Sequence, residues 1–230
     1  MPVLRTLLAA FAALPVIAGA VPSRHWREFP VEVGAFRVLT RDSGPRNYYR
    51  LVTEGPETFI RGVYMPGLET VTLFAPVADE LHRGVRLFKF RWRVHALPRG
   101  GNECEDGRGD SAANVYITWK RGLRWYSIKL AWSSVAPAGA TCNVIRNPFI
   151  ASDSVILRSG PPLDVWQEEE VDPDALFRAH FEGGDPTAEV PELQGIGILT
   201  DGDQTQSLSV ADYAGFVFYK EERIAARKTP

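Results

Sequence analysis

The chain has 230 residues, of which 26 are basic and 28 acidic, so its formal net charge is −2. This balance gives no general attraction for nucleic acid or anionic membranes, and argues against a nucleic-acid-binding protein. The 17 prolines and 20 glycines are spread along the chain, which favours many short strands joined by tight turns in one domain.

The N-terminus has the three parts of a secretory signal peptide. Arg5 supplies the positive charge, Leu7–Ala18 is a short apolar stretch, and Ala18–Ala20 are the small residues at which signal peptidase cleaves. We therefore expect residues 1–20 to be removed, with an uncleaved N-terminal anchor as the alternative. No later segment has the roughly 18 apolar residues of a membrane helix. The mature chain is expected to be exported, either periplasmic or secreted, without a membrane span.

Alternation of apolar and polar residues, which is typical of half-buried strands, recurs along the chain. In the clearest run, Phe88, Phe90, Trp92 and Val94 share one face, and Lys89, Arg91, Arg93 and His95 share the other. Weaker runs predict strands at Phe36–Thr40, Tyr48–Thr53, Phe59–Tyr64, Thr70–Phe74, Ser154–Arg158, Gly195–Thr200 and Tyr213–Lys220.

The two cysteines, Cys104 and Cys142, are an even pair in a chain predicted to be exported. This predicts one disulfide, which would stabilise the fold by about 4 kcal/mol in the chain-entropy model. The alternative is two free or metal-binding thiols, although neither cysteine lies in a CxxC pair or near a histidine.

Two further alternating runs, Asn114–Lys120 and Trp125–Trp132, flank a turn at Lys120-Arg121-Gly122 and predict a hairpin. If Ile117 and Ile128 point inward, Tyr116 and Trp125 point outward, beside Lys129. Exposed rings among hydrogen-bonding side chains suit carbohydrate, and large exposed aromatic surface calls for an explanation. The alternative is that a loop or helix covers the rings.

A single helix is predicted near residues 173–182, because Asp172 can cap it and Pro173 suits its first position. The Glu168–Glu170 run before it is interpreted as a solvated segment. About ten strands without βαβ alternation predict an all-β fold, a two-sheet antiparallel sandwich of jelly-roll type. The domain is expected to span residues 21–219, followed by a polar C-terminal tail at 220–230.

The basic face of the Phe88–His95 run offers Arg91, Arg93 and His95 as a site for an acidic glycan or another anionic ligand. Cations spaced two residues apart lie about 6.6 Å from one another and repel unless something opposes them. The opposing charge can be internal. The candidates for it are Glu103, Glu105, Asp110 and the Glu168–Glu170 run.

Asp201 and Asp203 lie one residue apart on a predicted loop. Calcium takes six to eight oxygen ligands, so this spacing indicates a candidate calcium site with Asp110 as a third ligand. The alternative is that both aspartates bond to the backbone of their own turn.

Several short strings resemble the exported bacterial family catalogued as domain of unknown function 3047. The resemblance covers roughly residues 85–219, with a looser match from Trp26 onward. The strings, in order, are Phe90–Val94, Gly109–Tyr116, Ala131–Ser133, Arg158–Gly160 and Thr200–Thr205. The resemblance implies export and a β architecture, and it implies no chemistry because the family is uncharacterised.

The first functional hypothesis is a non-catalytic exported module that binds carbohydrate or another cell-envelope polymer through Tyr116 and Trp125, with Arg91 and Arg93 meeting anionic groups. The alternative is a lyase or hydrolase acting on an acidic polysaccharide, in which His95 or Tyr116 moves protons. A third is a structural envelope protein without a small ligand. No residue set in the sequence amounts to a catalytic signature.

Overall fold

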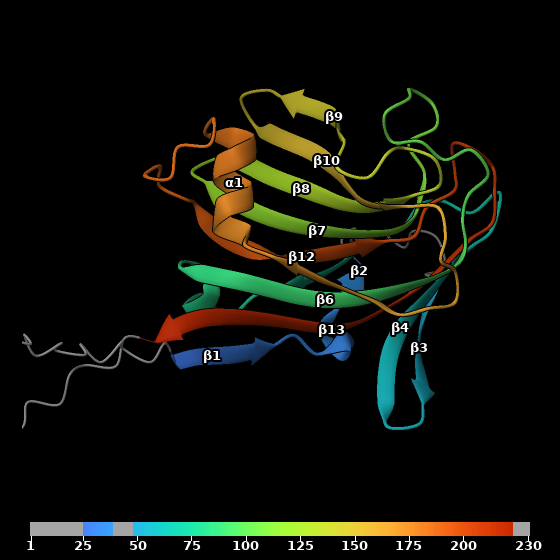
Figure 1. Cartoon of the computed structure of the whole chain (residues 1–230), viewed down its shortest axis with the longest axis horizontal. Helices are drawn as coiled ribbons and strands as arrows, with labels where there is room; N and C mark the ends of the chain where they lie inside the picture. Colours follow the sequence, from blue (N-terminus) through green and yellow to red (C-terminus); the bar gives the residue numbers. More distant parts are fainter. Residues whose placement is uncertain (1–24, 39–47, 223–230) are drawn as a thin grey trace, which may run out of the picture.

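The computed structural model describes residues 25–38 and 48–222, so the predicted signal peptide lies outside the described residues. The described chain folds into two sheets that share one hydrophobic core (Figure 1). This confirms the predicted all-β sandwich of jelly-roll type. Among these residues no helix is long and apolar enough to cross a membrane.

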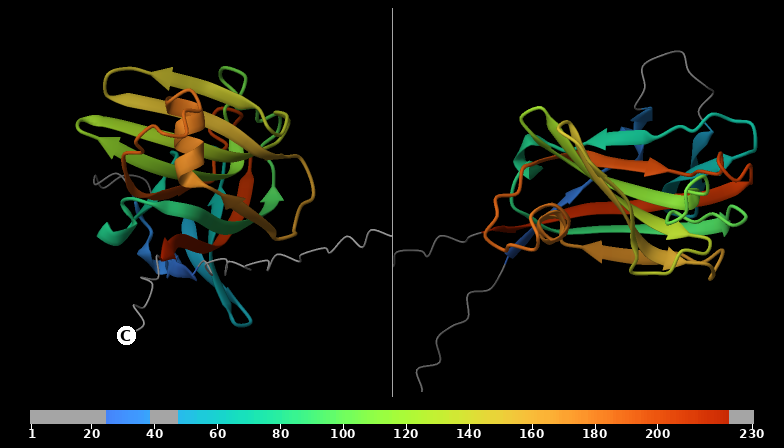
Figure 2. Two further views of the ribbon diagram at one scale, coloured as in Figure 1. Left: turned by 60° about the vertical axis from the view of Figure 1, so that its left-hand side comes forward. Right: turned by 90° about the horizontal axis from the view of Figure 1, so that it is seen from above.

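The six-stranded sheet runs in the order β11-β6-β13-β4-β3, with β1 paired to one end of β13. Its β3–β4 hairpin extends beyond the rest of the sheet (Figures 1 and 2). The strands are β1 (His25–Pro30), β3 (Tyr49–Glu54), β4 (Glu57–Tyr64), β6 (Val85–Ala96), β11 (Gln167–Val171) and β13 (Ser209–Glu222).

The seven-stranded sheet runs in the order β2-β5-β12-β7-β8-β10-β9. Two short 3-10 helices, η1 (Val33–Ala35) and η2 (Asp79–Leu81), lie in the connections. The strands are β2 (Arg37–Val38), β5 (Leu73–Pro76), β7 (Ser111–Arg121), β8 (Arg124–Ser133), β9 (Thr141–Arg146), β10 (Ile150–Ser159) and β12 (Glu192–Leu199).

One strand pair departs from the antiparallel prediction. β10 pairs in parallel with β8, whereas the other pairs of the described sheets are antiparallel. The chain leaves β8, forms β9 at the sheet edge, and returns as β10 between the two. Two reversals of direction therefore leave β8 and β10 running the same way.

The predicted alternation holds in the strands that form the core. Phe88, Phe90, Trp92 and Val94 of β6 are buried, and Ile117 and Ile128 of the β7–β8 hairpin are buried opposite them. The hairpin turns at Gly122, whose positive φ of 59° suits a residue without a Cβ atom. Burial of these side chains orients the alternate residues of both strands toward the outer faces of the sandwich.

The predicted helix is α1 (Pro173–Phe181), and the Asp172 side chain caps it by accepting a hydrogen bond from the Ala175 N–H at 3.0 Å. The helix lies across the ends of β7 and β8 (Figure 1). There the ring of Phe177 packs against Trp119 and Tyr126, with centroid distances of 5.5 and 5.1 Å.

Four segments differ from the prediction. The Glu168–Glu170 run belongs to strand β11 rather than to a solvated segment, because Glu169 accepts a hydrogen bond from Trp92 and pairs with Arg158. β13 continues through Glu222, so residues 220–222 belong to the sheet rather than to the tail. β1 and β9 lack strict alternation, and no strand is predicted for either.

Candidate functional site

A cleft of about 830 Å³ lies on the outer face of the seven-stranded sheet. Strands β7, β8, β9 and β10 contribute to it, together with the loops that contain Cys104 and Asp201. On its floor lie Tyr116, Ser127, Lys129 and Ser152, the outward residues of strands whose alternate side chains are in the core.

Strand register explains why these four side chains meet. Tyr116 of β7 is opposite Lys129 of β8, and Ser127 of β8 is beside Ser152 of β10. Directly paired residues on one face of a sheet have Cβ atoms about 5 Å apart. The cleft floor therefore follows from the same alternation that places Ile117 and Ile128 in the core.

Three hydroxyl groups on this floor are free to meet a ligand. Those of Tyr116, Ser127 and Ser152, called here the hydroxyl row, have no hydrogen-bond partner among residues 25–38 and 48–222. Burial, and then the nearby Asp201 and Glu103, raises the pKa of Tyr116 well above its usual range. The Tyr116 hydroxyl is therefore a neutral donor and acceptor at physiological pH.

Lys129 is the only basic residue among the described residues that line the cleft. Its Nζ donates to the carbonyl oxygen of Gly109 at 3.3 Å. An ammonium group has three donors, so this bond leaves capacity for a ligand.

Glu103 lies close to Lys129 and is fully buried, and neither of its carboxylate oxygens has a hydrogen-bond partner within the described part of the chain. Burial raises the pKa of Glu103, and Lys129 partly opposes that increase. Sequence reasoning considered this residue only as a counter-charge for the basic face. It lies in an irregular loop, where no periodic pattern marks a residue that points inward.

The three aspartates predicted as calcium ligands come together beside the cleft. One carboxylate oxygen from each of Asp110, Asp201 and Asp203, called here the acidic triad, lies within 4.8 Å of the others. Burial, followed by the charges of Asp203 and Asp110, raises the pKa of Asp201 to about 6. Three carboxylates at this spacing can hold a divalent cation.

The loops position the acidic triad through backbone N–H groups. Asp110 accepts from Gln204 at 3.2 Å and from Thr205 at 2.6 Å, and Asp201 accepts from Gly202 at 2.8 Å. The bond from Gly202 to Asp201 is of the kind that the sequence alternative expected, in which a turn aspartate bonds to the backbone of its own turn. The bonds to Asp110 instead come from a different loop. They link the loop after β12 to the loop before β7.

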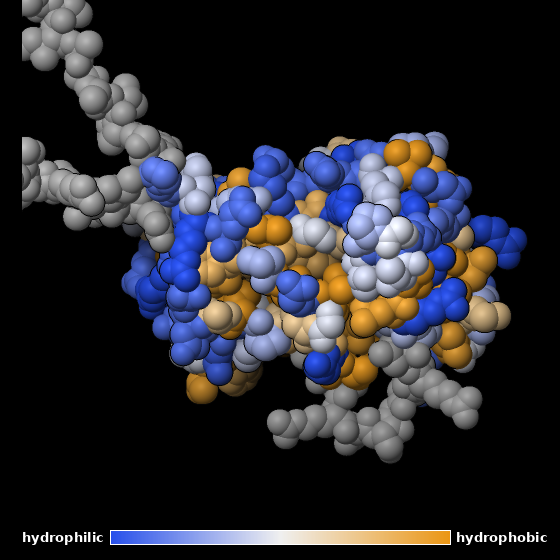
Figure 3. Space-filling model, turned by 90° about the horizontal axis from the view of Figure 1, so that it is seen from below, coloured by the Kyte–Doolittle hydropathy of each residue, from blue (hydrophilic) through white to orange (hydrophobic). Residues whose placement is uncertain are grey.

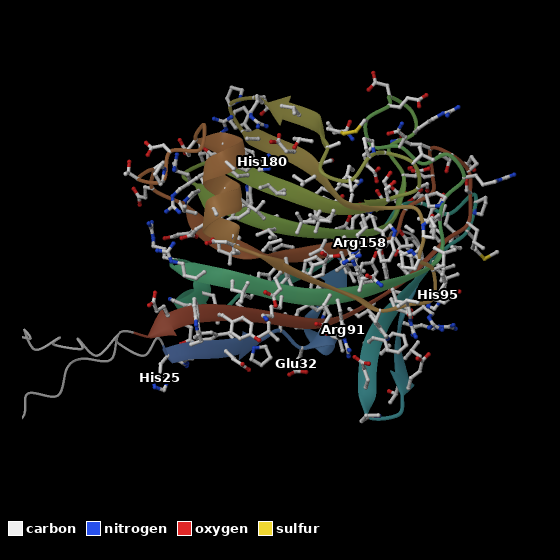
Figure 4. All side chains as sticks on the ribbon, viewed as in Figure 1. His25, Glu32, Arg91, His95, Arg158 and His180 are labelled. Atoms are coloured by element: carbon white, nitrogen blue, oxygen red, sulfur yellow. A yellow bond between two sulfur atoms is a disulfide. The ribbon has the colours of Figure 1, made fainter. Side chains whose placement is uncertain are left out.

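The predicted disulfide between Cys104 and Cys142 is present, and both cysteines line the cleft. Figure 4 shows it in yellow, joining the loop before β7 to β9. The covalent link therefore fixes the wall of the cleft that carries Asp106 and Gly109.

Trp125 points outward on the same sheet face as predicted, but it lies outside the cleft. It is 43% exposed, and Lys120 Nζ lies 4.9 Å from its ring centroid. The structure thus separates the two predicted stacking residues, with Tyr116 in the cleft and Trp125 farther along the sheet.

The predicted basic face is fully paired with carboxylates. Arg93 and His95 bond to the buried Asp212, with closest distances of 2.6 and 2.7 Å. Lys89 pairs with Glu170, and Arg91, which is labelled in Figure 4, pairs with Glu57. The negative charge that opposes these cations therefore comes from the protein itself. Of the acidic residues that the sequence suggested for this role, the Glu168–Glu170 run supplies one partner, Glu170. Binding of an anion on this face stays a prediction.

The structure does not bring the basic face and Tyr116 together. Arg91 and Arg93 lie on the outer face of the six-stranded sheet, whereas Tyr116 lies on the outer face of the seven-stranded sheet. An enzyme in which Tyr116 moves protons beside Arg91 and Arg93 does not fit this arrangement, whereas His95 lies on the same strand face as Arg91 and Arg93.

A family model described as "Protein of unknown function (DUF3047)" matches residues 45–217. The chain belongs to this family. The match confirms the resemblance found in the sequence. No curated protein matches the chain.

Several solved structures are similar over most of the chain, at low identity. A family 11 carbohydrate-binding module from Clostridium thermocellum, in complex with a β-1,3-1,4-mixed-linked tetrasaccharide, is 8% identical with a TM-score of 0.37, covering 89% of this chain and 92% of that one. The xyloglucanase domain of NopAA from Sinorhizobium fredii, in complex with cellobiose, is 11% identical with a TM-score of 0.42, covering 84% and 100%. The Trichoderma harzianum endoglucanase 3 from family GH12 is 9% identical with a TM-score of 0.36, covering 89% and 100%. Identities and TM-scores this low assign no function to the DUF3047 chain.

Proposed function

We propose that this protein is an exported, non-catalytic module that binds carbohydrate in the cleft on the outer face of the seven-stranded sheet. The observation that carries the proposal is the hydroxyl row, whose three hydroxyls line the cleft without a partner among the described residues. Hydroxyl groups that line a cleft and are not engaged by the protein itself are open to a ligand that brings its own donors and acceptors.

The chemistry of the cleft matches a polyhydroxylated ligand. A sugar hydroxyl can both donate and accept, as can each member of the hydroxyl row, and Lys129 adds charged donors. Val144 and Leu199 add apolar surface to the same cleft. The hydroxyl row and Lys129 can then bond to the hydroxyl groups of a sugar, while Val144 and Leu199 contact its C–H faces.

The charge of the cleft favours a neutral glycan over an acidic one. Lys129 is opposed by Asp106 and Asp201 within the lining, and by Glu103 behind it. A uronate or phosphate group would meet more negative than positive charge there, which costs binding energy. The acidic polymer considered from sequence would need the basic face of β6, whose cations are already paired.

Export is part of the proposal. The Cys104–Cys142 disulfide fits an oxidising compartment, because disulfides persist in the periplasm and outside the cell. This agrees with the signal peptide predicted at residues 1–20. The proposal also retains calcium, held by the acidic triad, as the ion that orders the loop at one end of the cleft.

A second candidate function is hydrolysis of the bound glycan, which Asp201 favours. Its carboxyl group lies beside the cleft, its pKa is about 6, and two further carboxylates lie within 4.8 Å. A carboxyl group that is partly protonated near neutral pH suits general acid catalysis. Release of reducing sugar by wild type, abolished in Asp201→Asn, would support hydrolysis, whereas binding without release supports the non-catalytic module.

The binding test is affinity electrophoresis through gels that contain neutral polysaccharides. We expect wild type to be retarded by at least one of them and Lys129→Met to lose about tenfold or more in affinity, because a hydrogen bond to a charged group contributes about 1.5–3 kcal/mol. The matched control is Lys89→Met, which removes an exposed cation from the other sheet.

Lys129 also interacts electrostatically with the buried Glu103, so its loss can destabilise the fold. Ser127→Ala and Ser152→Ala therefore provide a second test, because each removes one hydroxyl from the cleft floor and leaves the charges unchanged. Equal retardation of all these variants and wild type would overturn the proposed site.

A further inference from the structure

The outer face of the seven-stranded sheet continues beyond the cleft as an apolar surface. Trp125, Ile145 and Ile150 form it, with exposed fractions of 43, 47 and 46%. We call these three residues the apolar platform. Large apolar side chains that gather on one part of a surface mark an interaction site more often than single exposed ones do. Figure 3 shows the molecule from below Figure 1, a face on which apolar and hydrophilic residues are interspersed.

Strand register joins the apolar platform to the cleft. In the parallel β8–β10 pair, Ile150 is beside Trp125, and two residues farther along Ser152 is beside Ser127. Side chains two residues apart on a strand point to the same face. The platform and the hydroxyl row are therefore one surface.

β9 makes the same connection from the sheet edge. Ile145 is paired with Ser152 of β10, and Ile145 is also part of the cleft lining. Ile145 therefore belongs both to the cleft lining and to the apolar platform.

The spacing along β8 sets the length of ligand that can use both parts. Trp125 and Lys129 are four residues apart on one strand, which corresponds to about 13 Å. A single sugar ring is too small to contact both residues, whereas an oligosaccharide can extend from one to the other.

Trp125 is held in position for such a contact. Lys120, directly opposite it on β7, places its Nζ 4.9 Å from the ring centroid. A cation over a tryptophan ring restrains both side chains, so less entropy is lost when a ligand binds.

Resting on the proposed function, we infer that the ligand is a glycan chain of several units, and that Trp125 forms a second subsite outside the cleft. The chain lies along β8 and β10, with one end at Tyr116 and Lys129 and the other stacked on Trp125. Affinity therefore rises with the length of the glycan until it spans both subsites.

The test is isothermal titration with the disaccharide, tetrasaccharide and hexasaccharide of neutral glucans, xylan, mannan and chitin. For the glycans that bind, we expect wild type to bind the hexasaccharide at least about tenfold more tightly than the disaccharide, a difference of about 1.4 kcal/mol. Trp125→Ala is expected to remove this dependence on length and to leave disaccharide affinity unchanged. Trp26→Ala is the control, because Trp26 is also 43% exposed but lies on β1 of the other sheet.

Three results would overturn the inference while leaving the proposed function intact. One is equal affinity of wild type for short and long glycans, and another is an unchanged length dependence in Trp125→Ala. A third is self-association of wild type that Trp125→Ala abolishes in sedimentation, which would assign the platform to a second copy of the chain. No binding by any glycan of the panel would instead contradict the proposed function itself.

Discussion

Two carboxylate sites in this protein, Asp212 and the acidic triad, differ in how their charge is balanced. Asp212 of β13 is fully buried and accepts hydrogen bonds from Arg61, Arg93 and His95, with closest distances of 2.6, 2.6 and 2.7 Å. Among residues 25–38 and 48–222, no arginine or histidine forms a hydrogen bond or ion pair with the acidic triad at the end of the cleft. Lys129 is the cation that acts on Asp201 there.

The pKa values of the two aspartates move in opposite directions. Burial by itself would raise the pKa of Asp212, but the hydrogen bonds from Arg61, His95 and Arg93 outweigh it and hold this pKa below its usual range. Burial and two neighbouring carboxylates raise the pKa of Asp201 to about 6. A compensated charge is part of the scaffold, whereas an uncompensated one beside a cleft is available to a proton, a cation or a ligand.

The largest expected effect is a loss of folding stability when Asp212, the compensated carboxylate, is replaced. Asp212→Asn leaves two partly buried guanidinium groups without their carboxylate, so we expect the free energy of unfolding to fall by about 3 kcal/mol. Urea denaturation measures it. Asp164→Asn is the control, because Asp164 bonds to the other nitrogen of His95 but is 71% exposed. Equal losses of unfolding free energy in the two variants would contradict the claim that the buried Asp212 holds this cluster together.

Calcium is expected to stabilise the folded protein by binding the acidic triad, whose charge is uncompensated. At a hundred times its dissociation constant it should add about 2.7 kcal/mol to wild type, a rise of several degrees in melting temperature. Asp203→Asn should abolish this rise, while the fully exposed Asp79→Asn should retain it. A melting temperature that is the same in calcium and in chelator would show that the acidic triad binds no calcium.

The raised pKa of Asp201 predicts a particular dependence of stability on pH in chelator. A group whose folded pKa is raised contributes stability that is present below its unfolded pKa, near 4, and lost as pH rises through about 6. Asp201→Asn keeps the acceptor for the Gly202 N–H and removes this loss. We expect the variant to be more stable than wild type by about 2 kcal/mol near pH 8 and equal to it near pH 4. Parallel stability curves for the two proteins would contradict the assignment.

Local patterns predicted those parts of the site that lie on strands. Alternation oriented Tyr116 and Lys129 outward, and the Asp201-Gly202-Asp203 spacing indicated the loop that meets Asp110. The predicted directions of Tyr116 and Lys129 succeed because side-chain direction on a strand has a period of two and depends on few long-range contacts.

The parts that could not be predicted depend on pairing between distant segments. Glu103 points inward from an irregular loop, and Asp212 finds Arg61 across 151 residues of sequence. The acidic strand β11 lacks β propensity and is held by pairing with β6 and by its contacts to Trp92 and Arg158. Tertiary contacts of this kind override local propensity.

The central claim is that a glycan binds on the outer face of the seven-stranded sheet, and backbone amide chemical-shift mapping tests it most directly. The titrant is the neutral hexasaccharide with the highest affinity in the titration panel. We predict perturbed amides in β7, β8 and β10 and in the Asp201 loop, with the amides of β6 and β13 unchanged. Perturbations centred on β6 and β13, or none anywhere at saturating glycan, would contradict the claim.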